Sequence, residues 1–238
     1  ELLNSLLLSF PGTPIIYYGD EIGMGDNIYL GDRNSVRTPM QWSADRNAGV
    51  SRAIPAKLYS PVIIDPVYGS EAVNAESQIG EASSMFNWMR NMIALRKVFR
   101  VFGRGTMEFL HPNNRKILAY LRRGEGETVL CVANLSRFAQ PVELNLEAFQ
   151  GMRPVEMLGY VEFPVIGSQP YTLSLGPYGF MWFELQKARE PIESISEANG
   201  SSAASVNMGA GWEGVFEGPG KKIVERELPA YLPRQRWF

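Results

Sequence analysis

The spacing of hydrophobic positions changes near residue 103. Before this point, apolar residues recur at helical spacing in two stretches and also form one short uninterrupted run. After it, short runs rich in Val, Leu, Tyr and Phe are separated by turn residues, which is the spacing of β-strands. The pattern therefore predicts an α/β part followed by an all-β part.

The α/β part opens with a helical stretch whose apolar face consists of Leu2, Leu3, Leu6, Leu7 and Leu8. The stretch ends at residues 10–12, Phe-Pro-Gly, which is a helix stop signal. The next run, PIIYY at residues 14–18, is typical of a strand that is buried on both faces in a parallel sheet. A helix, a tight turn, a buried strand and a polar loop in this order predict the last β/α unit of a (β/α)8 barrel.

A long irregular stretch and a second helix complete the α/β part. Residues 43–80 are rich in Pro, Ser, Asn and Ala, which is typical of a functional loop or a small subdomain. In residues 83–102 the apolar positions return to helical spacing, at Met85, Trp88, Met89, Met92, Leu95, Phe99 and Phe102. We expect this stripe to form core, and the basic residues Arg96, Lys97 and Arg100 suit the negative end of the helix dipole.

The all-β part contains seven runs with strand character, at residues 106–110, 115–123, 128–135, 141–146, 153–158, 171–175 and 179–185. In the fourth run, Val142, Leu144 and Leu146 alternate with Glu143 and Asn145. Short alternating strands at this spacing predict an antiparallel β-sandwich domain.

Composition divides the chain further. We expect residues 1–103 to be the C-terminal end of the barrel and residues 104–186 to be the β-sandwich. Residues 187–211 are rich in Glu, Ser, Ala, Asn and Gly, which predicts a flexible linker. Residues 212–238 regain apolar residues but are too few to form a core, so we expect the start of a further domain. Because the chain does not begin with Met and both ends look cut, we expect a segment of a longer polypeptide.

Charge and composition exclude several classes of function. The 238-residue chain has a formal net charge of −2, so nothing argues for a nucleic-acid partner. No apolar run approaches the roughly 18 residues that span a bilayer, so we expect no membrane partner. The single cysteine, Cys131, excludes an internal disulfide and fits a reducing compartment, for which we expect the cytoplasm. The sequence leaves oligomeric state open, a homo-oligomer included.

The usual catalytic constellations are missing from the sequence. The only histidine, His111, precedes Pro112 in a predicted turn, where a surface role is favoured over that of a catalytic base. With one His and one Cys there is no zinc site, and neither a glycine-rich phosphate loop nor a nucleophile elbow occurs. Cys131 lies at the centre of a predicted strand, so we expect it to be inert packing.

Charged residues gather directly behind the predicted strand. Asp20 and Glu21 follow the strand, where barrel geometry would aim them at the mouth of the site. Carboxylates accept hydrogen bonds from sugar hydroxyls, which would suit substrate binding. The alternative is that both acids cap the next helix or pair with Arg33 or Arg37, and the sequence does not separate these readings.

The second charged segment, residues 31–42, contains Arg37 in front of a Thr38-Pro39 bend. A guanidinium held by such a bend can pair with a carboxylate and still donate to a hydroxyl. Trp42 could offer an apolar face to a pyranose, although packing is its favoured role.

Three segments closely resemble a known family. PGTPIIYYGDEIGMGDN (11–27) and GDRNSVRTPMQWSADRNAG (31–49) resemble the α-amylase superfamily of glycoside hydrolases, in the branch that contains oligo-1,6-glucosidases and trehalose synthases. NAESQIGEASSMFNWMRNMIALRK (74–97) resembles the barrel-closing helix of trehalose synthases, and the whole resemblance spans roughly residues 1–186. It implies that Arg37 contacts the sugar in the glucose subsite, and that Asp20 and Glu21, which match a GDE pattern, have a supporting role.

The resemblance implies a mechanism with an aspartate nucleophile, a glutamate acid and a second aspartate that holds the sugar. Two displacements through a glucosyl-enzyme give net retention. Maltose becomes trehalose when the released glucose stays in a closed pocket and attacks through its own anomeric hydroxyl. The expected small molecules are therefore maltose, trehalose and glucose. All three acids belong to motifs upstream of Glu1, so no catalytic residue is expected in this segment.

The resemblance also implies what should accompany the segment. No cofactor is evident in it, and the structural calcium that family members often hold would have its ligands upstream of residue 1. The last residues, LPAYLPRQRWF (228–238), resemble the start of bacterial maltokinases, so we expect a fused maltokinase domain. Two other functions stay open: a hydrolytic α-glucosidase of the same superfamily, and a non-catalytic β-sandwich module associated with carbohydrate.

We predict that the isolated 238-residue chain does not turn over maltose. One β/α unit does not close a barrel, and the reacting acids are expected outside the segment. Proton NMR of maltose incubated with the purified chain checks this, and formation of glucose or trehalose would contradict it.

Overall fold

The computed structural model describes residues 1–124 and 126–187. All of the described residues belong to one compact unit, Glu1–Ala188. The predicted linker, apart from Lys187, and the predicted start of a further domain lie outside the described residues. Among the residues that are described, the helices are too short or too polar to cross a membrane.

The helices of the described residues are α1 (Leu2–Ser9), α2 (Ala75–Gly80), α3 (Met85–Val98) and α4 (Val101–Arg104). Short 3-10 helices η1 to η5 span Asp20–Ile22, Asp32–Val36, Arg46–Gly49, Pro55–Lys57 and Glu147–Phe149. The strands are β1 (Thr106–Leu110), β2 (Ile117–Gly124), β3 (Glu127–Asn134), β4 (Gln140–Leu144), β5 (Met152–Glu156), β6 (Val161–Glu162), β7 (Tyr171–Leu175) and β8 (Phe180–Lys187).

The strands form two antiparallel sheets. The larger has the order β1-β2-β3-β8-β5-β6, and the smaller consists of β4 and β7. This arrangement fits the predicted β-sandwich, and all seven predicted runs are strands. The two-residue strand β6 was not predicted, because a segment this short has too few residues to show alternation. In β4 the predicted alternation is confirmed, since Val142 and Leu144 are buried whereas Glu143 is exposed.

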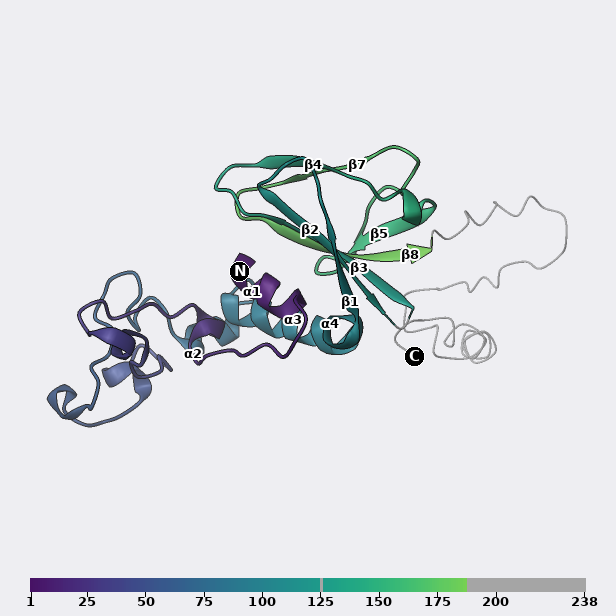
Figure 1. The fold of residues 1–238 in the computed structure, drawn as a ribbon. Helices are drawn as coiled ribbons and strands as arrows, with labels where there is room; N and C mark the ends of the chain where they lie inside the picture. The colour runs from purple at the N-terminus through teal and green to yellow at the C-terminus, as the bar shows by residue number, and fades with distance from the viewer. Residues whose placement is uncertain (125, 188–238) are drawn as a thin grey trace, which may run out of the picture. The chain divides into compact units, whose positions relative to one another are not determined.

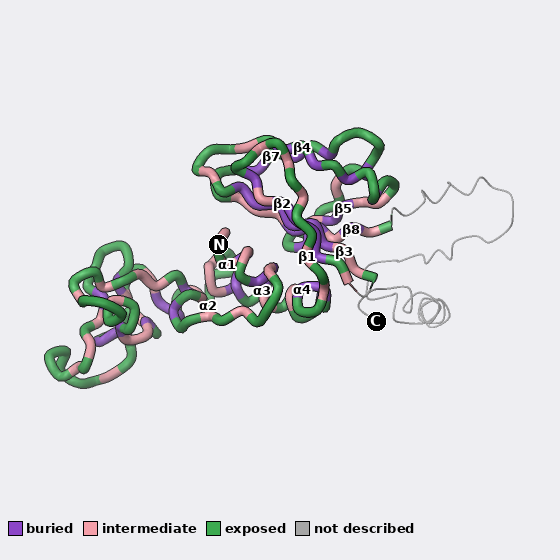
Figure 2. The backbone as a smooth tube through the Cα atoms, in the orientation of Figure 1, coloured by how far each residue is buried: buried purple, intermediate pink, exposed green. Residues whose placement is uncertain are grey.

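The larger sheet is covered on both faces (Figure 1). One face packs against β4 and β7, and the side chains between the sheets form the sheet cluster, which includes Leu121, Leu130, Leu144, Leu173 and Phe183. The other face packs against α1, α3 and α4 in the helix cluster, which includes Leu8, Met92, Phe102, Cys131 and Trp182. Neighbouring residues of one strand therefore enter different cores, because side chains alternate along a strand. Figure 2 shows the central strands as the most buried part of the backbone.

The predicted second helix is confirmed over most of its length. It begins at Ser84, whose hydroxyl accepts a hydrogen bond from the Asn87 backbone N–H at 3.2 Å, an N-cap interaction. The predicted core stripe is also confirmed, with Met89, Met92 and Phe102 buried. The helix breaks at Phe99, whose φ of −90° and ψ of 100° are extended, so that α4 forms a separate helix.

The prediction of a strand at residues 14–18 is wrong. They have no strand assignment, and Ile15 is 82% exposed. A strand needs hydrogen bonds from a neighbouring strand, and within residues 1–124 and 126–187 every strand belongs to the two antiparallel sheets. Among the described residues, the Pro14–Tyr18 run therefore lacks the neighbouring strand that its apolar pattern predicts.

A buried arginine joins the helices to the sheet. Arg122 on β2 is 0% exposed. Its Nε donates to the Thr106 carbonyl at 3.1 Å, one Nη donates to the Ser9 carbonyl, and the other lies 2.9–3.0 Å from the carbonyls of Val101, Phe102 and Gly105. Burial lowers the pKa of this guanidinium. Its charge is balanced by carbonyl dipoles, because no carboxylate within the described segments forms an ion pair with it.

A second arginine acts at the same corner. Arg96 of α3 donates to the carbonyls of Leu8 and Gly12, the latter at 2.6 Å, so it holds the C-terminal end of α1 and the turn that follows. At the start of α4, the Glu127 carboxylate accepts a hydrogen bond from the Val101 N–H at 3.1 Å. The described helices and sheet are thus joined by directed polar contacts as well as by apolar packing.

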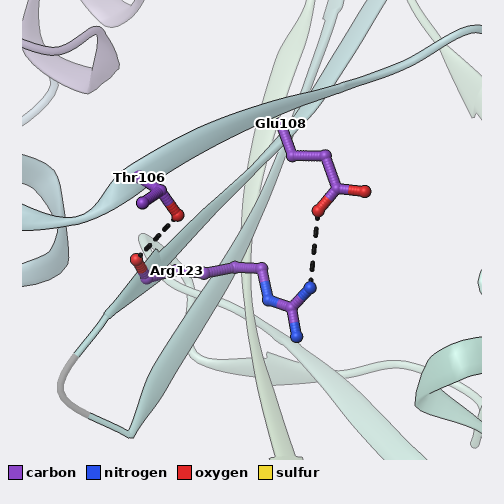
Figure 3. Close-up of polar contacts among 3 residues, drawn as sticks. All are labelled: Thr106, Glu108 and Arg123. Atoms are coloured by element: carbon purple, nitrogen blue, oxygen red, sulfur yellow. Dashed lines mark hydrogen bonds and ion pairs between the residues drawn. The ribbon is translucent and has the colours of Figure 1, made fainter.

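We predict that Arg122→Met destabilises the chain by at least about 3 kcal/mol, because several buried carbonyls lose their donor. The urea midpoint of tryptophan fluorescence should fall by about 1 M or more. Arg123→Met is the matched control, since the Arg123 side chain is 51% exposed and makes an exposed ion pair with Glu108 at 3.4 Å (Figure 3) and a cation–π contact with Phe149, 5.4 Å from the ring centroid. It should cost less than about 1 kcal/mol, and equal shifts for the two variants would contradict the role of Arg122.

Candidate functional site

A glycine turn follows the Pro14–Tyr18 run and carries both candidate acids. Gly19 has a φ of 93°, and a Cβ at this position would lie 2.7 Å from the Met24 sulfur, so only glycine fits. The Asp20 carboxylate accepts a hydrogen bond from the Tyr17 N–H at 3.1 Å, and the Glu21 carboxylate accepts one from the Gly19 N–H at 2.8 Å. Both acids therefore hold the backbone of their own turn, and neither is presented as a free nucleophile.

Arg37 lies at the end of η2. The turn contains Asp32 at a φ of 52°, and the Arg37 N–H donates to the Asn34 carbonyl at 3.1 Å. The Arg37 side chain is exposed, and among the described residues it has neither an ion pair nor a side-chain hydrogen bond. The alternative pairing of Asp20 or Glu21 with Arg37 is thus not seen in this part of the chain, and the guanidinium is available to a ligand.

A side-chain hydrogen bond joins Tyr18, which directly precedes the glycine turn (residues 19–23), to the Arg37 segment, residues 31–42. The Tyr18 hydroxyl donates to the Thr38 carbonyl at 2.9 Å. Partial burial raises the pKa of Tyr18, as does the neighbouring Tyr17, whereas the positive charge of Arg37 acts in the opposite direction. The Arg37 guanidinium therefore lies close enough to Tyr18 for its charge to influence the pKa of the Tyr18 hydroxyl.

Behind Arg37 the chain is anchored by buried amides. Gln41 is fully buried, and its Nε2 donates to the carbonyls of Tyr68, at 3.1 Å, and Val73. Gln78 of α2 donates to the Ile22 carbonyl at 2.7 Å. The Oγ1 of Thr38 and the Oε1 of Gln41 are buried without a hydrogen-bond partner in the described part of the chain. Such groups carry a desolvation cost.

Two grooves lie near these residues. One, of about 610 Å³, lies between the Pro14–Tyr18 run and α3 and is lined by Ile16, Tyr17, Tyr18, Glu21, Met89 and Ile93 among others. The other, also of about 610 Å³, lies among the loops and is lined mainly by residues 25–30 and 61–65. Arg37 lines neither groove. Trp42 is 56% exposed, so the packing favoured for it is not seen within the described residues.

His111 and Cys131 lie where the sequence predicts them. His111 is exposed in the connection between β1 and β2. Cys131 is buried in β3, and burial raises the pKa of its thiol well above the usual value, which leaves it protonated and inert. Among residues 1–124 and 126–187, no group of three His, Cys, Asp or Glu side chains is placed to hold a metal ion.

The sequence reasoning missed the contacts that hold these segments together. Tyr18 was assigned to a buried strand, and its bond to Thr38 spans 20 residues, a separation that no local pattern shows. Arg122 could have been found, because strand alternation places it on the same face of β2 as Tyr120. The Arg96 contacts with α1 likewise cross more than 80 residues.

Two family profiles match adjacent parts of the chain. Residues 1–105 match the catalytic domain of α-amylase, and residues 107–182 match the C-terminal domain of maltogenic amylase. The first match contains Asp20, Glu21 and Arg37, and the second contains most of both sheets.

Curated relatives agree with these matches. The chain is 56% identical over 200 residues to "Trehalose synthase/amylase TreS" of Mycolicibacterium smegmatis, covering 80% of this chain and 33% of the relative. It is 54% identical to a trehalose synthase of Pimelobacter sp., with 78% and 33% covered, and 50% identical to one of Thermus thermophilus, with 82% and 20% covered. The chain thus spans about a third or less of the length of these relatives.

Solved structures show the same fold. A trehalulose synthase variant in complex with Tris matches with a TM-score of 0.62 at 25% identity, covering 77% of this chain and 37% of that one. An isomaltulose synthase mutant from Erwinia rhapontici, in complex with D-glucose, matches with a TM-score of 0.60 at 24% identity, with 78% and 37% covered. The chain belongs to the α-amylase superfamily, as an α-amylase catalytic-domain segment with its C-terminal sheet domain, homologous to trehalose synthases.

Proposed function

We propose that this chain is the C-terminal part of an enzyme that interconverts maltose and trehalose by intramolecular α-glucosyl transfer. The observation that carries the proposal is the identity of 50–56% to trehalose synthases over about four fifths of the chain. The relatives are longer, so the proposal concerns the whole enzyme to which this segment contributes.

The reacting groups of this enzyme would lie on other barrel strands. A carboxylate would attack the anomeric carbon of maltose while an acid protonates the departing oxygen, and a second displacement would restore the α-configuration. For trehalose to form, the released glucose must turn and attack before water does. Exclusion of water is therefore the property that would separate an isomerase from a hydrolase.

Within this segment, we assign substrate binding to Arg37, supported by Asp20 and Glu21. The exposed and unpaired Arg37 guanidinium can donate to sugar hydroxyls and also face an acid of the barrel. Asp20 and Glu21 support the site by fixing the turn beside it, through their bonds to the Tyr17 and Gly19 N–H groups.

Further parts of the proposal concern what surrounds the segment. On the sequence of residues 228–238 we propose that a maltokinase domain follows. On the lone Cys131 we propose a reducing, cytoplasmic compartment. A structural calcium, if the whole enzyme holds one, would take its ligands from outside this segment.

A second candidate is hydrolysis of the same substrate. The name of the Mycolicibacterium smegmatis relative includes amylase as well as trehalose synthase, which favours some transfer to water. In this reading the same glucosyl-enzyme would be opened by water, and free glucose would be the product. A non-catalytic carbohydrate-associated module is the third reading, and turnover by the whole enzyme distinguishes it from the other two.

We predict that the full-length enzyme incubated with maltose produces trehalose as the main product, with glucose as a minor one. Proton NMR separates the anomeric signals of the three sugars and checks this directly. Glucose as the sole product would make the enzyme a hydrolase, and no turnover at all would favour the non-catalytic reading.

We also predict that Arg37→Ala in the full-length enzyme lowers kcat/KM for maltose by roughly 10- to 150-fold, which corresponds to about 1.5–3 kcal/mol for a lost charged hydrogen bond. Arg33→Ala is the matched control, because Arg33 is an exposed cation in the same loop, and its kcat/KM should stay within about two-fold. An unchanged kcat/KM for Arg37→Ala would remove Arg37 from the site.

A further inference from the structure

Tyr18 connects two segments that each carry a proposed site residue. It ends the Pro14–Tyr18 run and directly precedes the Gly19 turn that holds Asp20 and Glu21. Its hydroxyl crosses to the Arg37 segment and donates to the Thr38 carbonyl at 2.9 Å. Because the Tyr18 ring is 42% exposed, loss of the hydroxyl alone would leave no large cavity.

The Thr38 carbonyl, which accepts this hydrogen bond, is well placed to fix the backbone next to Arg37. It belongs to the Thr38–Pro39 peptide bond, and proline restricts the residue before it to extended backbone. Thr38 itself is only 1% exposed, so its peptide groups have little room to move. A donor that fixes the Thr38 carbonyl therefore fixes the backbone one residue from the Cα of Arg37.

The donor is itself held from both sides. On one side, the Asp20 and Glu21 carboxylates hold the N–H groups of Tyr17 and Gly19, the residues that flank Tyr18. The Tyr17 and Tyr18 rings also pack together, with centroids 4.6 Å apart. On the other side, Arg96 donates to the carbonyl of Gly12 at 2.6 Å, two residues before the run begins. Tyr18 thus extends from a hydrogen-bonded turn to the peptide group next to the exposed Arg37.

The exposed Arg37 guanidinium has no protein partner of its own within the described residues. The point from which this side chain projects is set by its backbone, and a small displacement of a binding group can weaken its contact with substrate. Within the described residues, the Tyr18 hydroxyl donates a side-chain hydrogen bond to the carbonyl of Thr38, the residue next to Arg37.

We propose that Tyr18 is a positioning residue, which through the Thr38 carbonyl sets the direction in which Arg37 meets the sugar. The inference rests on the proposed function, since it requires Arg37 to contact substrate. It also gives Asp20 and Glu21 a specific task, which is to hold the turn that supports Tyr18.

The test is a double-mutant cycle in the full-length enzyme, with total maltose consumption as the readout. Tyr18→Phe should raise KM about five-fold and leave kcat within about two-fold, because a less well positioned Arg37 weakens binding of the ground state and the transition state alike. In the Arg37→Ala background the same change should have no further effect on KM, because the residue that Tyr18 positions is gone. Tyr160→Phe is the control for loss of an exposed tyrosine hydroxyl in the sheet domain, and its KM should equal that of the parent.

The outcomes separate this inference from the proposed function. Unchanged KM in Tyr18→Phe, or the same loss in both Arg37 backgrounds, overturns the positioning role while a loss in Arg37→Ala still supports Arg37 in the site. A lowered Tm for Tyr18→Phe together with equal losses in both backgrounds would assign Tyr18 a purely structural role. If Arg37→Ala alone has no effect, both claims about this site fail. Maltose consumption without trehalose leaves the cycle fully readable and contradicts only the isomerase.

Discussion

The described structure depends on the Arg122 guanidinium, a buried charge that pairs with peptide carbonyls. Those carbonyls come from the end of α1, from α4 and from the start of β1. Helix C-termini concentrate partial negative charge, so they can solvate a cation that has left water. The desolvation cost is then offset without a buried acid, whose own desolvation would add to it. The charge on β2 is satisfied only when helices and sheet are assembled.

The hydrogen bonds of Arg122 and Arg96 fix the point at which the chain leaves α1 and enters the Pro14–Tyr18 run. Arg122 and Arg96 hold the end of α1, from which the Pro14–Tyr18 run departs, and Tyr18 then reaches the backbone beside Arg37. The loops between these points are largely exposed. Their order comes from a few hydrogen bonds with buried partners, such as those of Gln41 and Gln78, rather than from a core of their own. A loop built in this way can have a defined position without being extensively packed.

How far the sequence predicts the structure differs between its parts. Every strand of the sheet domain except the two-residue β6 could be predicted, because alternation such as that of Val142, Glu143 and Leu144 is a local signal of which face is buried. The helix at 85–98 was equally clear from its apolar stripe, whereas its Ser84 cap was seen only in the structure. The strand at 14–18 was predicted from an apolar run, but a strand exists only with a neighbour to bond to.

The candidate site could be predicted only as a region of the sequence. The positions of Asp20, Glu21 and Arg37 behind an apolar run indicated this region, and the family resemblance implied a role for Arg37 that stays a prediction. Whether an acid faces a ligand or its own backbone depends on a few dihedral angles, and sequence spacing does not specify these. The link between Tyr18 and Thr38 is a tertiary contact, so it became visible only with the fold.

The placement of α4 has a consequence for recombination between members of the superfamily. The two family profiles meet at residues 105–107, which suggests a natural junction for exchanging one C-terminal domain for another. A crossover there would give the incoming domain an arginine whose acceptors at 101–105 come from a different parent. Chimeras should therefore take α4 and the sheet domain from the same parent, so that the arginine and the carbonyls at 101–105 that accept its hydrogen bonds come from one protein.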